Sequence, residues 1–257
     1  MINFVRKLDK LFILIVLGNV WIWKIFNFNL LIALIVIVSS WFLLQSVGTR
    51  KVSKVLLLLF LILLIFQFRT TKIYSLSYLT EQEKLFQIQR LKEYPLVYIQ
   101  IFNKHLWIPA ANWFEEKPWV LSLYKIRKNL TDVVSPNLYF FSNHPNERVE
   151  IKDFEKFPYI LLPFFVVGFL NFDYRRNLKL FLLSFIIPLL VIALIGQLNP
   201  IGPFILFPFV SVVSFCGLKY AYDWFRISEY KRSKILIGLF VLAYFAVFIQ
   251  TIFYARS

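Results

Sequence analysis

The stretch FNLLIALIVIVSSWFLLQSVGTRKVSKVLLLLFLILLIFQF, which covers Phe28–Phe68, decides the class of fold. It holds two apolar runs, Phe28–Gln45 and Val52–Phe68, separated by a short basic turn. A helix needs about 20 residues to cross the hydrocarbon layer of a membrane, with about 17 as the lower limit. The two runs therefore predict a pair of membrane-spanning helices joined on one side of a bilayer.

Five further apolar runs extend this pattern through the rest of the chain. They are Leu11–Phe26, Tyr159–Phe172, Leu180–Gln197, Ile201–Tyr222 and Ile235–Tyr254. Of the 257 residues 59% are hydrophobic, whereas an ordinary soluble domain has about 45–50%. The sequence predicts an all-α polytopic membrane protein with about seven transmembrane helices. The run Tyr159–Phe172 is short for a span, so we expect it to borrow flanking residues or to be partly re-entrant.

The net charge of +15 is explained by membrane topology, and we expect no nucleic-acid partner. Basic residues flank the apolar runs, as they do at the cytoplasmic ends of spanning helices. When successive loops are placed on alternate sides, the basic residues of the short segments fall almost entirely on one side, which we predict to be cytoplasmic together with the amino terminus. They are Arg6, Lys7, Lys10, Arg50, Lys51, Lys54, Arg175, Arg176, Lys179, Arg226, Lys231, Arg232 and Lys234.

This topology places one large loop, Arg69–Pro158, on the non-cytoplasmic side. The loop holds ten of the fourteen acidic residues and is rich in aromatic residues and prolines. Prolines break it into short pieces, so we expect short helices and irregular structure. The loop either packs as a small cap domain or lies at the membrane interface, where Trp and Tyr are favoured. The predicted regions are 1–68 with three membrane helices, 69–158 as the loop, and 159–257 with four membrane helices.

Conventional catalytic and cofactor motifs are absent from the sequence. Cys216 is the only cysteine, and the chain has two histidines, so neither a disulfide framework nor a metal cluster is expected. Seven glycines leave little material for a phosphate-binding loop. We therefore expect no metal and no cofactor.

The segment from Asn129 to Leu170 carries a likeness to a known family. It contains Ser135-Pro136, then Leu138–Phe141, then Asn146 and Arg148, and it continues into Leu162-Pro163-Phe164. In this order and spacing it resembles the GT-C glycosyltransferases that use polyprenyl-phosphate sugars, the protein O-mannosyltransferase and aminoarabinose-transferase type. The resemblance covers roughly residues 100–220 and implies binding of a lipid-linked sugar.

The chain departs from this family where catalysis is concerned. The family carries its catalytic acid in the first outward loop, but here that segment is Lys24–Asn29, which has no acid. The amino-terminal helices of the family also do not fit into the three runs before Arg69. The chain therefore looks like the carboxyl-terminal portion of such a transferase, and we predict that it is catalytically incomplete alone. Glu115 and Glu116 are the first candidates for a substitute acid.

The turn SNHPNER offers a candidate site for a lipid phosphate. His144, Asn146 and Arg148 lie in it, and the planar guanidinium of arginine matches a phosphate. The alternative is a hydrogen-bonded turn with no ligand, which Pro145 and Asn146 favour. The family's Gly-Asp pair is replaced here by Asn143-His144.

Two functional hypotheses follow from the sequence. In the first, the chain binds a polyprenyl-phosphate sugar, or partners a complete transferase, in the plasma membrane of a prokaryote. In the second, it is a scaffold or assembly subunit of a membrane complex without a sugar-transfer role. Membrane lipids are partners in both.

Overall fold

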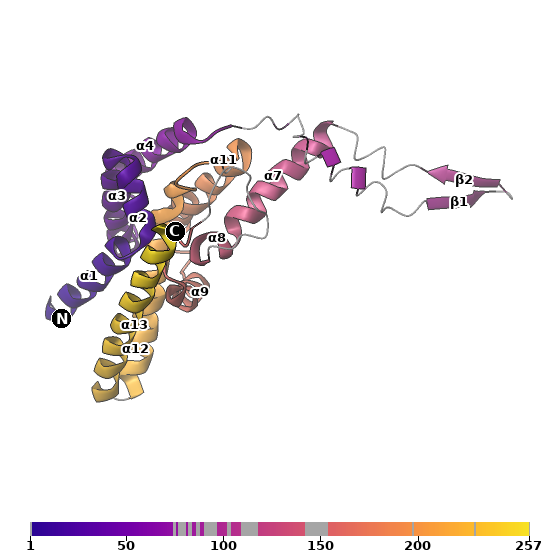
Figure 1. Cartoon of the computed structure of the whole chain (residues 1–257). Coiled ribbons are helices and arrows are strands. Elements are labelled where there is room, and N and C mark those ends of the chain that lie inside the picture. Colours follow the sequence, from indigo (N-terminus) through magenta and orange to yellow (C-terminus); the bar gives the residue numbers. More distant parts are fainter. Residues whose placement is uncertain are drawn as a thin grey trace.

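A computed structural model gives the arrangement of the helices (Figure 1). It describes residues 2–73, 97–101, 104–108, 118–141, 154–196, 198–228 and 230–256, together with Leu76, Glu81, Lys84, Leu85, Ile88 and Gln89. In chain order the elements are α1 (Ile2–Leu17), α2 (Val20–Phe28), α3 (Leu30–Thr49), α4 (Lys54–Thr70), β1 (Val97–Ile101), β2 (Lys104–Ile108), α7 (Pro118–Val134), α8 (Asn137–Phe140), a 3₁₀ turn η1 (Tyr159–Leu161), α9 (Leu162–Leu170), α10 (Leu178–Phe181), a π turn η2 (Leu182–Ile186), α11 (Ile187–Ile195), a 3₁₀ turn η3 (Phe204–Leu206), α12 (Phe207–Ser228) and α13 (Tyr230–Arg256).

Among the described residues, three continuous helices are long and apolar enough to cross a membrane. They are Leu30–Thr49, Leu178–Ile195 and Phe204–Trp224. A fourth span results if Lys10–Leu17 and Val20–Phe28 count as one helix, although they are bent by 59°. The structure thus supports a helical membrane protein with three or four candidate spans among its described residues, and the predicted count of about seven is not confirmed.

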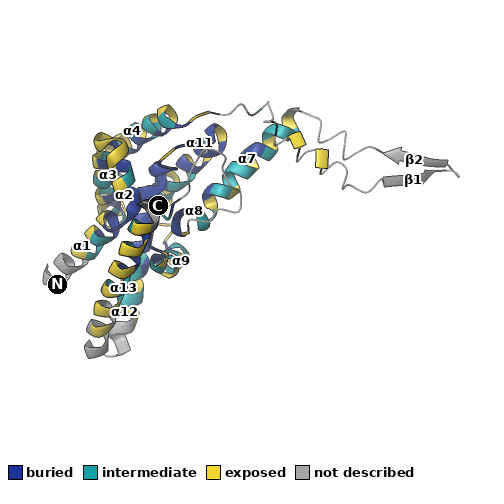
Figure 2. Cartoon of the chain, in the orientation of Figure 1, coloured by how far each residue is buried: buried dark blue, intermediate teal, exposed yellow. Residues whose placement is uncertain are grey.

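The outer faces of these helices are apolar, as a lipid environment requires. On α3, for example, Leu30, Leu34 and Val38 recur every fourth residue and are 40–53% exposed (Figure 2). Soluble monomers rarely expose contiguous apolar patches of this kind. In a bilayer such side chains lie among lipid tails at no cost.

The first apolar run is broken at Asn19, which is completely buried. Its side-chain amide donates to the carbonyl oxygens of Ile15 and Val16, both at 2.8 Å. Its side-chain oxygen accepts from the backbone N–H of Ile22 at 2.9 Å and so caps α2. Asn19 thereby supplies hydrogen-bond partners for two carbonyl groups at the end of α1 and for one N–H group at the start of α2. The chain can bend here because these backbone groups stay paired inside an apolar layer.

The amino-terminal helices run antiparallel to α12. Phe12 contacts Phe215, with ring centroids 5.4 Å apart, and Trp21 contacts Phe207, also at 5.4 Å. The start of α1 and the end of α12 therefore lie at the same end of the bundle (Figure 1). Both are basic in sequence, which agrees with their placement on one side of the membrane.

Helices α9 and α12 cross at very short distance through Gly168 and Gly217. A Cβ atom on Gly217 would overlap the carbonyl oxygen of Phe164, and one on Gly168 would overlap that of Val213. Phe164 therefore lies beside Gly217 and Gly168 beside Val213, so the two helices are antiparallel. Small residues allow this close approach in membrane proteins. Strict alternation of spans would instead make α9 and α12 parallel.

The apolar segment around α9 therefore enters the bundle and returns at the same end of α12. Phe157 stacks near Phe207 at 5.2 Å before α9, and Phe172 lies near Phe209 at 6.4 Å after it. This geometry favours the re-entrant alternative for Tyr159–Phe172. Arg175 and Arg176 were predicted to lie on the same side of the membrane as Arg226, at the end of α12. The turn 171–177 that carries them lies instead at the amino-terminal end of α12, because Phe172 is near Phe209.

The predicted loop contains a β-hairpin that the sequence analysis did not anticipate. Strands β1 and β2 pair antiparallel, with Val97 opposite Ile108 and Ile101 opposite Lys104. Only two residues connect the strands, which is the commonest hairpin length. The segments VYIQI and KHLWI suit strands because they are rich in β-branched and aromatic residues. The expectation of short helices and irregular structure was therefore wrong at this position.

Candidate functional site

A short segment, residues 154–158, lies between α2 and α8 and carries the candidate site. The carbonyl oxygen of Tyr139 accepts from the backbone N–H groups of Lys156, at 3.1 Å, and Phe157, at 2.8 Å. On the other side, the backbone N–H of Trp21 donates to the carbonyl of Lys156 at 3.3 Å. The segment is thus held by the backbone of both neighbours, and its side chains have defined positions.

The side chain of Lys156 is only 2% exposed. Its ammonium group donates to the carbonyl oxygen of Leu138 at 2.7 Å. It lies 5.0 Å from the centre of the Phe154 ring and 5.9 Å from that of Trp21. An ammonium group is costly to remove from water, and a carbonyl together with aromatic faces offsets part of that cost.

A second lysine approaches the same aromatic ring. The ammonium nitrogen of Lys24, on α2, lies 4.0 Å from the centre of the Phe154 ring. Two ammonium groups therefore converge on one phenylalanine, from segments more than a hundred residues apart in the chain. Two ammonium groups in this arrangement form a candidate site for an anion.

The wall behind Lys156 is formed by Trp21 and Gly202. Trp21 is completely buried, and its indole N–H donates to the carbonyl of Ile201. Gly202 has a φ of +71°, which favours glycine. A Cβ atom at this position would also lie 2.8 Å from Cε of Lys156. The backbone of Gly202 therefore leaves the space in which the lysine stem lies.

Buried polar side chains fix this wall to the end of α4. The side-chain amide of Asn199, 1% exposed, donates to the hydroxyl of Thr70 at 2.8 Å and accepts from the N–H of Ile201 at 3.0 Å. Gln67, 2% exposed, donates to the carbonyl of Gly202 at 3.4 Å. The loop that shapes the lysine pocket is thus hydrogen-bonded to a second part of the bundle.

Glu155 lies next to the buried lysine in sequence and is partly buried itself. One of its carboxylate oxygens accepts from the backbone N–H of Tyr159 at 2.9 Å. Burial raises the pKa of this carboxyl to about 7, although the hydrogen bond from Tyr159 acts in the opposite direction. A carboxyl group that titrates near neutral pH is suited to accept or donate protons.

The residues singled out from the sequence fare differently in the structure. Glu115, Glu116, His144, Asn146 and Arg148 lie outside the described residues, so their proposed roles stay predictions. The segment Lys24–Asn29, which lacks the expected acid, belongs mainly to α2 and brings Lys24 to the site. Within the described part of the chain there is no group of three or more His, Cys, Asp or Glu residues that could hold a metal ion.

Lys156 and Trp21 were not predicted as candidate residues from the sequence. The signal for Lys156 was present in the sequence DFEKFP, where a lysine stands between phenylalanines directly before an apolar run. A charge in such a place is expected to find partners inside the protein. No local pattern marks Trp21, because its role depends on contacts with Ile201 and Lys156.

The fold and this site define the class of the protein. It is a helical protein whose apolar helices are long enough to span a membrane, with a buried lysine at the junction of α2, α8 and the 199–203 loop. Comparison with protein-family models, with curated proteins and with solved structures finds no match.

Proposed function

We propose that this chain is related to the carboxyl-terminal portion of the GT-C glycosyltransferases and binds a lipid-linked sugar. The phosphate of a polyprenyl-phosphate sugar is bound at Lys156 and Lys24, on the non-cytoplasmic side of a prokaryotic plasma membrane. The chain partners a complete transferase and is catalytically incomplete alone. The convergence of two ammonium groups on the ring of Phe154 is the observation that carries this proposal.

The chemistry of the pocket supports a lipid phosphate as the ligand. Ammonium groups bind phosphate as compact point charges, and the weak screening of a partly apolar site strengthens that attraction. Trp21 and Phe154 lie close to the ammonium groups and Phe157 packs against Trp21, but all three side chains are buried, so they lower the local polarity and offer no open surface. A ligand with one charged group next to a long apolar chain fits such surroundings better than a fully water-soluble anion.

The non-cytoplasmic location is supported by the positions of the basic helix ends. The start of α1 and the end of α12 lie together, and Lys156 lies toward the opposite end of α12, where Phe157 meets Phe207. Applied to the ends of α1 and α12, the positive-inside rule favours the outer side for the lysine pocket. Arg175 and Arg176, in the turn 171–177, lie toward the same end of α12 as the pocket and count against this assignment. Lipid-linked sugars are used on that side by the family that this sequence resembles.

Binding of polyprenyl-phosphate sugar to the purified full-length chain tests the proposal. We expect Lys24→Gln, and Lys156→Gln if it folds, to weaken binding by about ten- to a hundred-fold, because a charge-assisted contact contributes about 1.5–3 kcal/mol. Lys179→Gln is the matched control, since it removes one exposed charge on α10. Lys24 is only partly buried, so its variant is expected to keep the fold, which thermal unfolding can verify.

Three outcomes would contradict this function. If Lys24→Gln and Lys156→Gln both fold and bind as the unchanged protein does, the pocket holds no lipid phosphate. If Lys179→Gln weakens binding equally, the effect reflects general charge. A chain that binds no polyprenyl phosphate at all would favour the alternative of a scaffold subunit.

The absence of independent catalysis can be tested with the same preparation. Incubation with labelled polyprenyl-phosphate sugars and a mixed acceptor pool is expected to give no transfer. Transfer that is lost on Glu155→Gln, Glu115→Gln or Glu116→Gln would overturn this expectation and identify the acid. Transfer that requires an added membrane protein would support the partner hypothesis.

A further inference from the structure

Helix α7 carries an apolar stripe that no described part of the protein covers completely. The stripe follows the spacing i, i+4, i+7, i+11 and i+15, which places its members on one face of a helix. Trp119 and Leu123 are each 56% exposed and Val134 is 51% exposed. The members, in order, are Trp119, Leu123, Ile126, Leu130 and Val134.

The stripe lies beside the main face by which α7 packs on the bundle, and of its members Leu130 also contacts the core. That face contains Asn129, whose side-chain amide donates to the carbonyl of Ala193 on α11 at 3.1 Å, and Val133, which is completely buried. On the other flank of the stripe, Arg127 and Thr131 are exposed. The helix therefore has three faces: one on the protein, one apolar and one polar.

The contact with α11 places α7 at the edge of the apolar layer. Ala193 lies two residues before the end of α11 at Ile195, within the candidate span Leu178–Ile195. The exposed side of α11 carries Leu190 and Leu194, each more than half exposed, which suits contact with lipid. The apolar stripe of α7 thus lies next to a lipid-facing helix, at the level where that helix ends.

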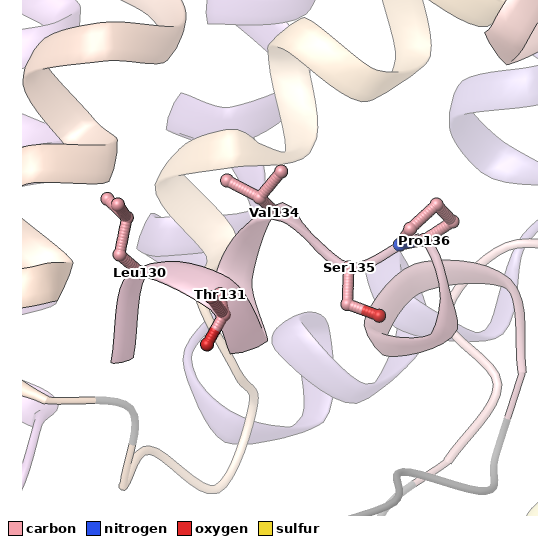
Figure 3. A pocket seen from close by; sticks show the side chains of 5 residues that line it. All are labelled: Leu130, Thr131, Val134, Ser135 and Pro136. Atoms are coloured by element: carbon pink, nitrogen blue, oxygen red, sulfur yellow. The ribbon is translucent and has the colours of Figure 1, made fainter. Parts of the chain in front are cut away.

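An open hollow at the end of α7 adds apolar surface to the stripe. It has a volume of about 330 Å³ and is lined by Leu130, Thr131, Val134, Ser135 and Pro136 (Figure 3). The side chains of Leu130 and Val134 point to one side of the helix, while the oxygen of Thr131 points to the other. That hydroxyl donates to backbone carbonyls of α7 itself, at 2.9 Å and 3.0 Å. The hollow therefore presents mainly carbon.

We infer that α7 is an interfacial helix that lies in the bilayer surface. Its apolar stripe and the adjoining hollow hold the acyl chains of the leaflet around the end of α11. Arg127 reaches the lipid phosphates from the neighbouring face. A stripe flanked by basic and polar residues, with a tryptophan at one end, has the chemistry of helices that bind at the headgroup boundary. This inference stands independently of any sugar ligand.

Fluorescent labels on single cysteines of the full-length chain in lipid nanodiscs test this placement. The native thiol is first removed by Cys216→Ala, since it is the only cysteine. An environment-sensitive dye is then attached after Leu123→Cys or Leu130→Cys on the stripe, and after Arg127→Cys or Thr131→Cys as matched positions on the same helix. Helical circular dichroism verifies that each variant is folded.

We expect lipids with a quencher near the headgroup to remove most of the emission from the two stripe positions. Aqueous iodide should quench these labels weakly and the labels at Arg127 and Thr131 strongly. Strong iodide quenching at Leu123 and Leu130 would show that the stripe faces water and would overturn the inference. Protection of both labels from lipid and from iodide would also overturn it, because another protein or a second copy would then cover the stripe.

Discussion

Replacement of Gly217 by alanine directly tests the crossing of α9 and α12. The added methyl group would lie 2.7 Å from the backbone nitrogen of Gly168 and would overlap the carbonyl oxygen of Phe164. Carbon atoms in ordinary contact are about 3.5–4.0 Å from their neighbours, so α9 must move away by about 1 Å or more. Both obstructing groups belong to helix backbone, which does not rotate aside as a flexible side chain does. Overpacking of this kind costs about 1–3 kcal/mol.

The assay is the loss of helical circular dichroism on heating the full-length chain in detergent. For a chain of this size 1 kcal/mol corresponds to about 2–4 °C, so we expect Gly217→Ala to lower Tm by roughly 2–12 °C. Gly238→Ala on α13 is the matched control, because a Cβ atom there meets nothing within 4 Å. That variant should gain up to about 1 kcal/mol from the better helix propensity of alanine.

Two comparisons decide the outcome for this crossing. If the Tm of Gly217→Ala equals or exceeds that of Gly238→Ala, α9 and α12 do not make this antiparallel contact. The re-entrant path of α9, which depends on this contact, would then also be refuted. The double variant with Gly168→Ala should be less destabilised than the two single effects added together, since both substitutions separate the same pair of helices. If the losses of Tm in the two single variants simply add up in the double variant, the two glycines do not belong to the same helix contact.

Four further predictions address topology, pH dependence, the outward turn and the pocket wall. Cysteines placed at Ser122 and Ser233 should react oppositely with a membrane-impermeant reagent in intact cells, Ser122 readily and Ser233 only after lysis; the reverse pattern would refute the orientation. Because burial raises the pKa of Glu155 from 4.5 to about 7, the folded state retains this proton where the unfolded state releases it, so stability should fall as pH rises through that window. Glu155→Gln should flatten this part of the pH profile of Tm, and an unchanged slope would exclude Glu155 as its source. Arg148→Ala should weaken binding of polyprenyl-phosphate sugar about ten- to a hundred-fold, with partial rescue by lysine, whereas unchanged binding in both variants would leave Arg148 in a structural turn. Asn199→Ala should lower stability by about 1–3 kcal/mol in chemical unfolding, because it leaves buried partners unpaired; no loss would contradict the bonding of the loop to α4.

The helices themselves were largely predictable from local sequence. Apolar runs of the right length mark α3 and α12, and Pro163 stands near the start of α9, where the missing N–H is tolerated. Pro188 lies inside the span Leu178–Ile195, directly after the π-helical segment Leu182–Ile186. The bend at Asn19 was not predicted. An asparagine in an apolar run usually hydrogen-bonds to a neighbouring helix, and only its three local hydrogen bonds show that it ends α1 and begins α2. The hairpin was also missed, since two five-residue segments without a regular alternation of polar and apolar residues are a weak signal.

The candidate site could be anticipated only in part. The sequence predicted that an outward segment and the following helices carry it, and the family resemblance directed attention to residues between 129 and 170. The particular pair of lysines was not foreseen, because Lys24 was considered only as the place of a missing acid. Their shared contact with Phe154 joins α2 to the segment before α9, and no sequence pattern encodes a contact over that separation.

The sequence by itself determined the membrane class, the approximate helix positions and the basic ends of the bundle. These depend on composition and on short-range periodicity, which act on each segment separately. Tertiary structure alone decided that α9 runs antiparallel to α12 and that the ammonium group of Lys156 is enclosed. The physical reason is that helix direction and burial are set by which surfaces fit together. The fit of Gly168 on Gly217, and of Lys156 against Gly202, exists only once distant segments have packed.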